Sequence, residues 1–206
     1  MRKIDFKKEY PDLYKAKKGV FSLVVVPRLQ YLQIDGEGDP NSTPAYTAAI
    51  EALYALAYNL KFFSKKELGR DYAVPPLEGL WWTERMEDFS SDKKGDWKWT
   101  MMILQPDWID SAAIEAQREK VAAKKALPAL PGVRLADYEE GLSVQTLHLG
   151  SYADEAPLID RMHQEYIPGN GLIPTGKHHE IYLNSPTRVA PEKLCTILRQ
   201  PVNELS

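Results

Sequence analysis

The sequence has little of what several classes of protein require. Its single cysteine, Cys195, excludes an internal disulfide and any multi-cysteine metal site. Its four histidines show no HxH, HxxH or HExxH spacing, so the pattern predicts no metal site. No apolar run approaches the roughly 20 residues that a helix needs to span a bilayer. The first residues, MRKIDFKKEY, contain no apolar signal core. We therefore expect a cytoplasmic protein that contacts no membrane.

Charge bias and cofactor motifs are also missing. A net charge of -3 gives no basis for nucleic-acid binding as the main task. Neither the GxxxxGK[ST] phosphate loop nor the GxSxG nucleophile turn occurs. The GEGDP segment (36–40) lacks the strand and helix that surround a dinucleotide-binding glycine motif. We therefore expect no cofactor and no direct contact with nucleic acid.

What the chain does contain is one order of elements, present twice. In the first copy, a strand that ends at Gly38 is followed by Pro44 and a helical pattern; in the second, Gly150 and Pro157 take these places. Two further strand patterns follow each helix. This order predicts an α+β fold made of a tandem pseudo-repeat. Each of the two modules reads strand-helix-strand-strand, and we expect antiparallel sheets with a ligand groove between the modules.

The predicted boundaries follow from the only proline-rich connector, LPALPG, at 127–132. Module one is expected at about 20–106 and module two at about 135–202. A connecting helix and linker are expected at 107–134, and the whole chain, 1–206, is expected to form one domain.

A polar triplet marks one strand of the second copy. His178, Glu180 and Tyr182 alternate, so on a strand they share one face, while Ile181 and Leu183 would point the other way, toward the helices. The alternation leaves open whether this face is exposed to solvent or forms the floor of a pocket. In a pocket, burial would raise the pKa of Glu180 and make it a general base or a partner for a cationic ligand.

Two other features also have alternative interpretations. All five tryptophans, residues 81, 82, 97, 99 and 108, fall within one stretch of the first copy. They indicate either ordinary core packing or a flat aromatic pocket. Glu155 falls in the first turn of the second-copy helix, where the simplest role of an acid is to interact with the helix dipole.

The segments LEGLWW, DWKWTMMILQP, VQTLHLGSYADE, GKHHEIYLNSP and TILRQPV together resemble the GyrI-like small-molecule-binding family, in its stand-alone branch. The resemblance runs from about Val26 to Val202. It implies a ligand groove between two modules, with Glu180 on its floor. The family is related to effector-binding domains of regulators that bind planar, aromatic and cationic drugs. This chain shows no helix-turn-helix segment, so we do not expect it to act by itself as a DNA-binding regulator.

Some stand-alone members are cyclopropanoid cyclopropyl hydrolases, which open the cyclopropane of DNA-alkylating natural products by adding water and so protect the cell. On that resemblance, Glu155 and Glu180 are the candidate catalytic residues. The candidate ligand-binding residues are Trp82, Trp99, Met101, His178 and Tyr182. The sequence leaves open whether such a pocket hydrolyses its ligand or only sequesters it. The alternative function is a protein-interaction module of the gyrase-inhibitor type without catalysis.

Overall fold

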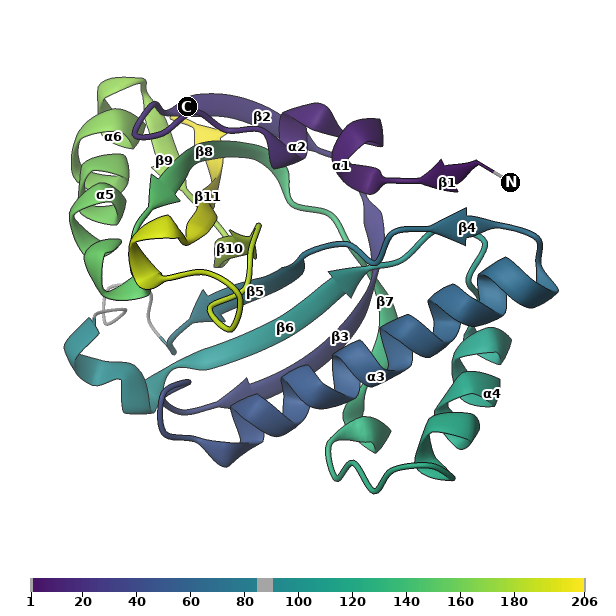
Figure 1. Ribbon diagram of the computed structural model, residues 1–206. Helices are drawn as coiled ribbons and strands as arrows, with labels where there is room; N and C mark the ends of the chain where they lie inside the picture. Colours follow the sequence, from purple (N-terminus) through teal and green to yellow (C-terminus); the bar gives the residue numbers. More distant parts are fainter. Residues whose placement is uncertain (1, 85–90, 206) are drawn as a thin grey trace. The chain divides into compact units, whose positions relative to one another are not determined.

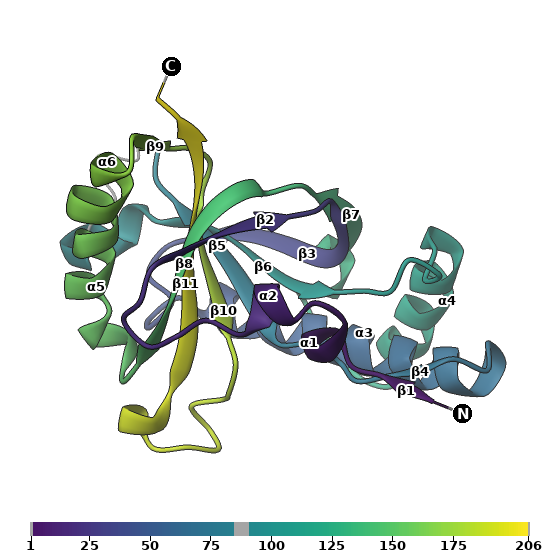
Figure 2. The same ribbon diagram turned by 90° about the horizontal axis from the view of Figure 1, so that it is seen from above.

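The computed structural model describes residues 2–84 and 91–205, and the chain divides into two compact units. Unit 1 contains the residues up to Glu9, together with Leu29–Pro75 and Trp82–Tyr138. Unit 2 contains Tyr10–Arg28, Pro76–Trp81 and the chain from Glu139 onward. Each unit combines helices with an antiparallel sheet, as Figure 1 and Figure 2 show, which confirms the predicted α+β class.

Unit 1 is organised around β3 (Leu29–Glu37), which pairs antiparallel with β6 (Lys98–Leu104) and with β7 (Arg134–Tyr138). The long helix α3 (Pro44–Glu67) packs on this sheet, and α4 (Ser111–Ala122) packs beside α3 (Figure 1). The short elements of unit 1 are β1 (Lys3–Ile4), α1 (Phe6–Glu9), β4 (Asp71–Tyr72) and the 3-10 helices η2 (Ser91–Asp96) and η3 (Leu130–Gly132).

Local sequence explains the two long helices of unit 1. Pro44 stands at the start of α3, where its missing N–H costs no helical hydrogen bond. The buried stripe of α3, at most 1% exposed, comprises Ala49, Ala52, Leu53, Leu56, Ala57 and Leu60. The connecting helix expected after residue 107 is α4. It begins after Asp110, whose carboxylate accepts a hydrogen bond from the Ala113 backbone N–H at 2.8 Å.

Unit 2 contains a five-stranded antiparallel sheet in the order β2-β8-β11-β10-β5. Its strands are β2 (Ser22–Val26), β8 (Gly141–Leu149), β11 (Cys195–Glu204), β10 (His178–Tyr182) and β5 (Leu77–Trp82), and β9 (Leu172–Pro174) pairs with β11. Its helical segments are α2 (Pro11–Tyr14), α5 (Ala156–Arg161), the π-helix η5 (Met162–Tyr166) and α6 (Ile167–Gly169). Two 3-10 turns, η4 (Tyr152–Asp154) and η6 (Pro191–Lys193), complete it.

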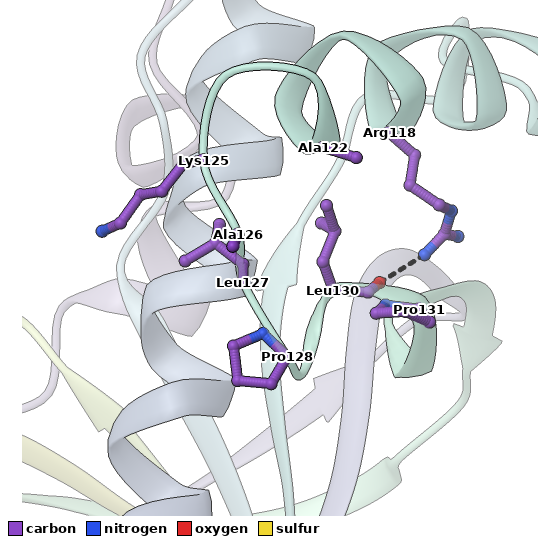
Figure 3. A pocket seen from close by; sticks show the side chains of 8 residues that line it. All are labelled: Arg118, Ala122, Lys125, Ala126, Leu127, Pro128, Leu130 and Pro131. Carbon is purple, nitrogen blue, oxygen red and sulfur yellow. Dashed lines mark hydrogen bonds between the residues drawn. The ribbon is translucent and has the colours of Figure 1, made fainter.

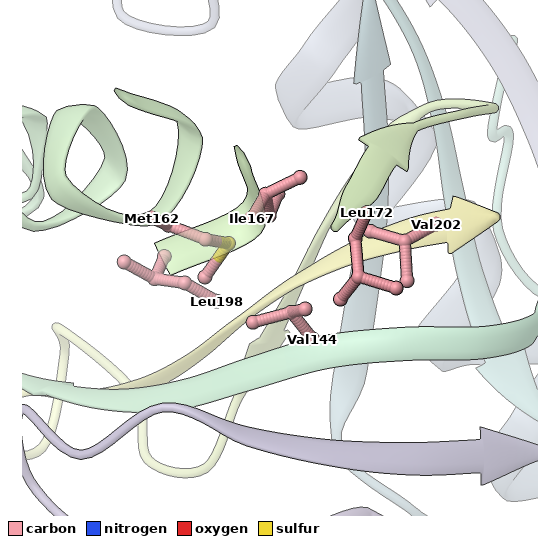
Figure 4. Packing of buried hydrophobic residues seen from close by; sticks show 6 residues of the cluster. All are labelled: Val144, Met162, Ile167, Leu172, Leu198 and Val202. Atoms are coloured by element: carbon pink, nitrogen blue, oxygen red, sulfur yellow. The ribbon is translucent and has the colours of Figure 1, made fainter. Parts of the chain in front are cut away.

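The core of unit 2 lies between its sheet and the helical segment α5-η5-α6. Met162 and Ile167 from this segment pack with Val144 of β8 and with Leu198 and Val202 of β11 (Figure 4). All five side chains are at most 2% exposed. The helical segment therefore covers the sheet face from which Val144 and Leu198 project.

The strand at the beginning of each predicted module pairs with a strand from the other half of the sequence. β2 lies in the first half but pairs with β8, and β7 lies in the second half but pairs with β3. The hydrophobic pattern of a strand identifies the strand but not its partner, so this exchange was not predictable from alternation. The pseudo-repeat and the module boundaries stay a prediction.

Trp99 is packed in the interior of unit 1. Its ring lies over Gly36, the residue directly opposite it in β3, and meets Tyr46 of α3 edge to face at 5.3 Å between centroids. A Cβ atom added at Gly36 would lie 2.1 Å from a ring carbon of Trp99. Glycine is therefore required at position 36 by the close approach of the indole.

We predict that Gly36→Ala lowers the free energy of unfolding of the protein by about 1–3 kcal/mol, the usual cost of overpacking a core. Denaturant unfolding followed by tryptophan fluorescence measures this change. Gly169→Ala is the matched control, because nothing lies within 4 Å of a Cβ atom at that position. Equal destabilisation by both substitutions would contradict the packing argument.

Candidate functional site

Glu180 projects from the face of the unit 2 sheet that the helices cover. In β10 it lies directly opposite Leu198 of β11, and cross-strand partners share a face. Leu198 packs against Met162 of η5, so Glu180 and its alternating neighbours are on the helical side. The expectation that Ile181 faces the helices is wrong. Alternation shows which side chains share a face, but it does not show which face the helices cover.

A chain of hydrogen bonds orients the Glu180 carboxylate. The Tyr182 hydroxyl donates to Glu180 Oε2 at 2.8 Å, and the Trp81 indole N–H donates to the Tyr182 hydroxyl at 3.2 Å. The ring of Tyr152 contacts Tyr182 edge to face, with 5.7 Å between centroids. The Glu180 side chain is 12% exposed. The carboxylate is thus half-buried among aromatic groups, which is the setting that the pocket interpretation requires.

His178 shares this face but does not neutralise the carboxylate. Its Nε2 lies 3.7 Å from Glu180 Oε1. Burial, reinforced by the nearby His163 and His179, lowers the pKa of His178 to about 3. Since the imidazole is neutral near pH 7, the contact is not an ion pair.

Glu155 is buried at the beginning of the helical segment. It immediately precedes α5, it is 4% exposed, and the helix that follows it packs on the face from which Glu180 projects. An acid that only interacted with the helix dipole would be solvated, so burial favours a more specific role. His163 follows on the π-helix, an element often found at functional sites. Burial lowers the pKa of His163 against the opposing effect of Asp160.

Of the other predicted ligand-binding residues, Trp99 and Met101 belong to unit 1, and Trp82, the last residue of β5, is the first residue of a segment of unit 1. Trp99 and Met101 are at most 1% exposed. Their place in one pocket with Glu180 stays a prediction. Trp81, which the sequence did not assign to the site, donates a hydrogen bond to the Tyr182 hydroxyl. The tryptophan cluster in the sequence included Trp81, but nothing in it distinguished Trp81 from Trp82.

Sequence reasoning missed a group of charged side chains on the opposite face of β10. His179 Nδ1 lies 3.0 Å from Glu140 Oε2, and His179 Nε2 lies 3.1 Å from Glu78 Oε2. Arg199 donates to the same Glu140 oxygen at 3.2 Å. We call Glu78, Glu140, His179 and Arg199 the charged clamp; their side chains are at most 2% exposed. Glu78, His179 and Arg199 occur in segments that carry the family resemblance. The alternation of a strand, however, does not show which polar side chains pair with each other.

Neighbouring groups complete the hydrogen bonds of the charged clamp. The Tyr14 hydroxyl donates to Glu78 Oε1 at 2.9 Å. The Arg199 guanidinium also donates to Gln145 Oε1 at 2.9 Å and to the Leu13 carbonyl at 2.6 Å. The two cations and two carboxylates therefore alternate, which is how a protein offsets the cost of burying charge.

The pKa directions agree with this alternation. Burial opposes the charge on His179, but Glu140 and then Glu78 more than offset it and raise the pKa of His179 to about 9. Burial likewise opposes the charge of Glu140, yet His179 and Arg199 hold its pKa below the usual value. His179 is therefore protonated near pH 7, in contrast to its neighbour His178.

A separate pocket of about 370 Å³ lies in unit 1, where α4 leads into η3 (Figure 3). Its wall consists mainly of alanine, leucine and proline side chains, and none of the predicted site residues lines it. Arg118, at its rim, donates to the Leu130 carbonyl and is committed to holding the loop.

Within residues 2–84 and 91–205, no helix has both the length and the apolar character needed to cross a membrane. Over the same residues, no group of three or more histidine, cysteine, aspartate or glutamate side chains is arranged to hold a metal ion.

A family model, the GyrI-like small molecule binding domain, matches residues 20–202. An uncharacterised conserved protein from Listeria innocua is 39% identical, with a TM-score of 0.89 over 98% of this chain and 100% of that one. Two hydrolases from Listeria innocua are 37% and 38% identical, with TM-scores of 0.87 and 0.83 over the same shares of the chains. The EcmrR C-terminal domain, at 11% identity and a TM-score of 0.57 over 90% of this chain and 98% of that one, shares the fold. No curated protein matches the chain.

The raised pKa of His179 predicts a loss of stability at alkaline pH. The folded pKa, about 9, lies above the ordinary value of 6.5, so the stabilisation is complete below pH 6.5 and is lost as the pH rises through 9. Thermal and denaturant unfolding between pH 6.5 and 10 should show the free energy of unfolding falling by at most about 1.4 kcal/mol per pH unit.

The matched pair of variants is His179→Gln and His148→Gln. The amide at position 179 does not titrate, so that variant should lack the alkaline decline. His148, which contacts the Ser151 carbonyl, is outside the charged clamp, so its variant should keep the decline. If the alkaline decline in the free energy of unfolding persists in His179→Gln, the titration of another group causes it.

Proposed function

Because the chain belongs to the GyrI-like family of small-molecule-binding domains, we propose that it binds planar hydrophobic or cationic molecules and opens the cyclopropane of DNA-alkylating cyclopropanoid compounds by adding water. The observation that carries the proposal is the half-buried Glu180 carboxylate, held by Tyr182 and Trp81 among aromatic rings. The 37–38% identity to two proteins named as hydrolases supports a hydrolytic reaction.

The chemistry needs only groups that this chain supplies. In the substrate, a cyclopropane is conjugated to a dienone, so ring strain and conjugation already activate one ring carbon. A water oxygen forms a bond to that carbon while a carboxylate accepts the water proton. The carbon–carbon bond breaks, and its electron pair moves through the conjugated system to the carbonyl oxygen, which becomes a phenolate and is protonated. The protein must hold the flat ligand, place one water and accept one proton.

Glu180 and Glu155 are the two residues assigned to proton transfer. Glu180 is partly buried among aromatic groups, and Glu155 is buried beside the helix that covers the same face of the sheet. The Tyr182 hydroxyl binds one oxygen of Glu180, and the other oxygen faces His178. Because the His178 imidazole is neutral, it does not neutralise the charge of the carboxylate. Trp82, Trp99, Met101, His178 and Tyr182 are assigned to the walls that bind the ligand.

We expect Glu180→Gln and Glu155→Gln each to lower kcat for ring opening by about 10²- to 10⁴-fold, the usual contribution of a general base. The amide keeps the size of the side chain but cannot accept the proton, so the dissociation constant of the ligand should change little. Mass spectrometry of a cyclopropane-containing alkylator measures the water adduct, and fluorescence titration measures binding. Wild-type turnover in both variants would exclude the two-carboxylate mechanism and leave sequestration as the function.

Trp82→Ala should act on a different constant. Removing the indole removes stacking area from the ligand, so the apparent affinity should fall by about tenfold while kcat at saturation stays near the wild-type value. Trp108→Phe is the control. Its indole packs on Tyr72 and donates to Ser64 within unit 1, and it is not assigned to the site. A Trp82→Ala variant with unchanged affinity would remove this residue from the proposed pocket.

A further inference from the structure

The charged clamp and the Glu180 carboxylate occupy opposite faces of the same short strand. His179 and Glu180 are consecutive in β10, a strand of five residues between β11 and β5. We propose that the charged clamp is the positioning device of Glu180: it fixes the register and rotation of β10 so that the carboxylate projects to the ligand side. This inference rests on the function proposed for Glu180, and it assigns a role to residues on the opposite face of the strand.

The first step is the selection of register. A slip of β10 by one residue in either direction would turn Glu180 onto the clamp face, because side chains alternate with a period of two. That face already holds two buried carboxylates, Glu78 and Glu140. A third buried carboxylate beside them would be strongly repelled. The clamp accepts a cation from β10 and rejects an acid, so it excludes the registers in which Glu180 is misdirected.

The second step is the orientation of the strand. Both ring nitrogens of His179 are engaged, one by Glu140 and the other by Glu78. The imidazole cannot turn without losing one of these contacts, and the backbone of the next residue is fixed with it. The carboxylates come from different segments: Glu78 lies on β5 and Glu140 immediately precedes β8.

The third step is the support of the clamp by the elements around it. Within the clamp, Arg199 of β11 lies directly opposite His179. From outside it, the hydroxyl of Tyr14 of α2 donates to Glu78. Two cations directly opposite each other would repel, and Glu140 lies between them. Removing the charge of Glu140 should therefore loosen β10 without touching the ligand face.

The first experiment compares Glu140→Gln with Asp71→Asn in the full chain, with a dienone-conjugated cyclopropane alkylator as the probe. Asp71 forms a largely buried ion pair with Lys61 at 2.9 Å in unit 1 and has no assigned role in the site. We expect Glu140→Gln to lower kcat by about 10- to 100-fold, because a displacement near 1 Å can cost about 10²-fold. Its apparent KM should stay within about threefold of wild type, and Asp71→Asn should keep wild-type kcat.

A pH profile supplies a readout that a merely structural role would not move. In wild type, kcat should fall as the pH passes about 9, where His179 loses its charge and one of its two ring donors. In His179→Gln, kcat should be low already at pH 7 and should show no further decline as the pH passes about 9. Thermal melts at each pH confirm that every variant is folded at the assay temperature.

Tyr14→Phe is the milder variant, to be used if Glu140→Gln does not fold. It removes only the hydroxyl that donates to Glu78, and we expect kcat to fall by about 2- to 5-fold, in line with the loss of one hydrogen bond. A folded Glu140→Gln with wild-type kcat overturns the proposal. If Glu140→Gln does not fold, a wild-type kcat in Tyr14→Phe overturns it.

A structural readout separates this proposal from the proposed function. If wild type neither binds nor opens the alkylator, the proposed function fails. Crystal structures of wild type and of Glu140→Gln, or of Tyr14→Phe in its place, then test the clamp alone. Displacement of Glu180 from Tyr182 in the variant supports the positioning role. An unchanged Glu180–Tyr182 hydrogen bond overturns it.

Discussion

Unit 2 depends on the burial of a protonated histidine between two carboxylates. Water stabilises an exposed ion, so removing His179 from water costs free energy, and only contacts of good geometry offset that cost. Glu140 contacts both cations of the charged clamp, and each other member contacts Glu140 or His179. The arrangement is therefore cooperative, because the loss of one member leaves an unmatched charge in the interior. A core of leucines at the same positions would tolerate change more readily, but it would specify the strand register less strictly.

The two faces of β10 meet opposite physical demands. On the clamp face, opposite charges are paired and the side chains are at most 2% exposed. On the helical face, Glu180 is oriented by neutral donors, first Tyr182 and then Trp81, and it borders a neutral imidazole. Glu140, by contrast, is paired with Arg199 and His179 and is committed to these partners. The same two residue types, histidine and glutamate, thus behave differently on the two faces because their surroundings differ.

The sequence predicted the elements better than their partners. The strand pattern, the start of α3 at Pro44 and the buried stripe of that helix follow from local rules that read a few neighbouring residues. The pairing of β2 with β8, and the covered face of β10, depend on residues far away in the chain. Alternation identified the set that contains Glu180 and Tyr182, but nothing local distinguished Trp81 from Trp82. The role of Glu140 could not be predicted, because two adjacent acids before a strand, Glu139 and Glu140, resemble any solvated turn residues.

The exchange of strands has a consequence for the order in which the chain folds. Leu23 of β2 pairs with Val144 of β8, so an early segment must wait for a late one before its backbone groups are satisfied. During synthesis, β2 leaves the ribosome long before its partner, and contacts so distant in sequence form slowly. A cut in the linker that joins the halves would leave β7 and β2 each on the fragment without its partner strand. The parts of the sequence on either side of the linker are therefore neither independent folding units nor interchangeable parts.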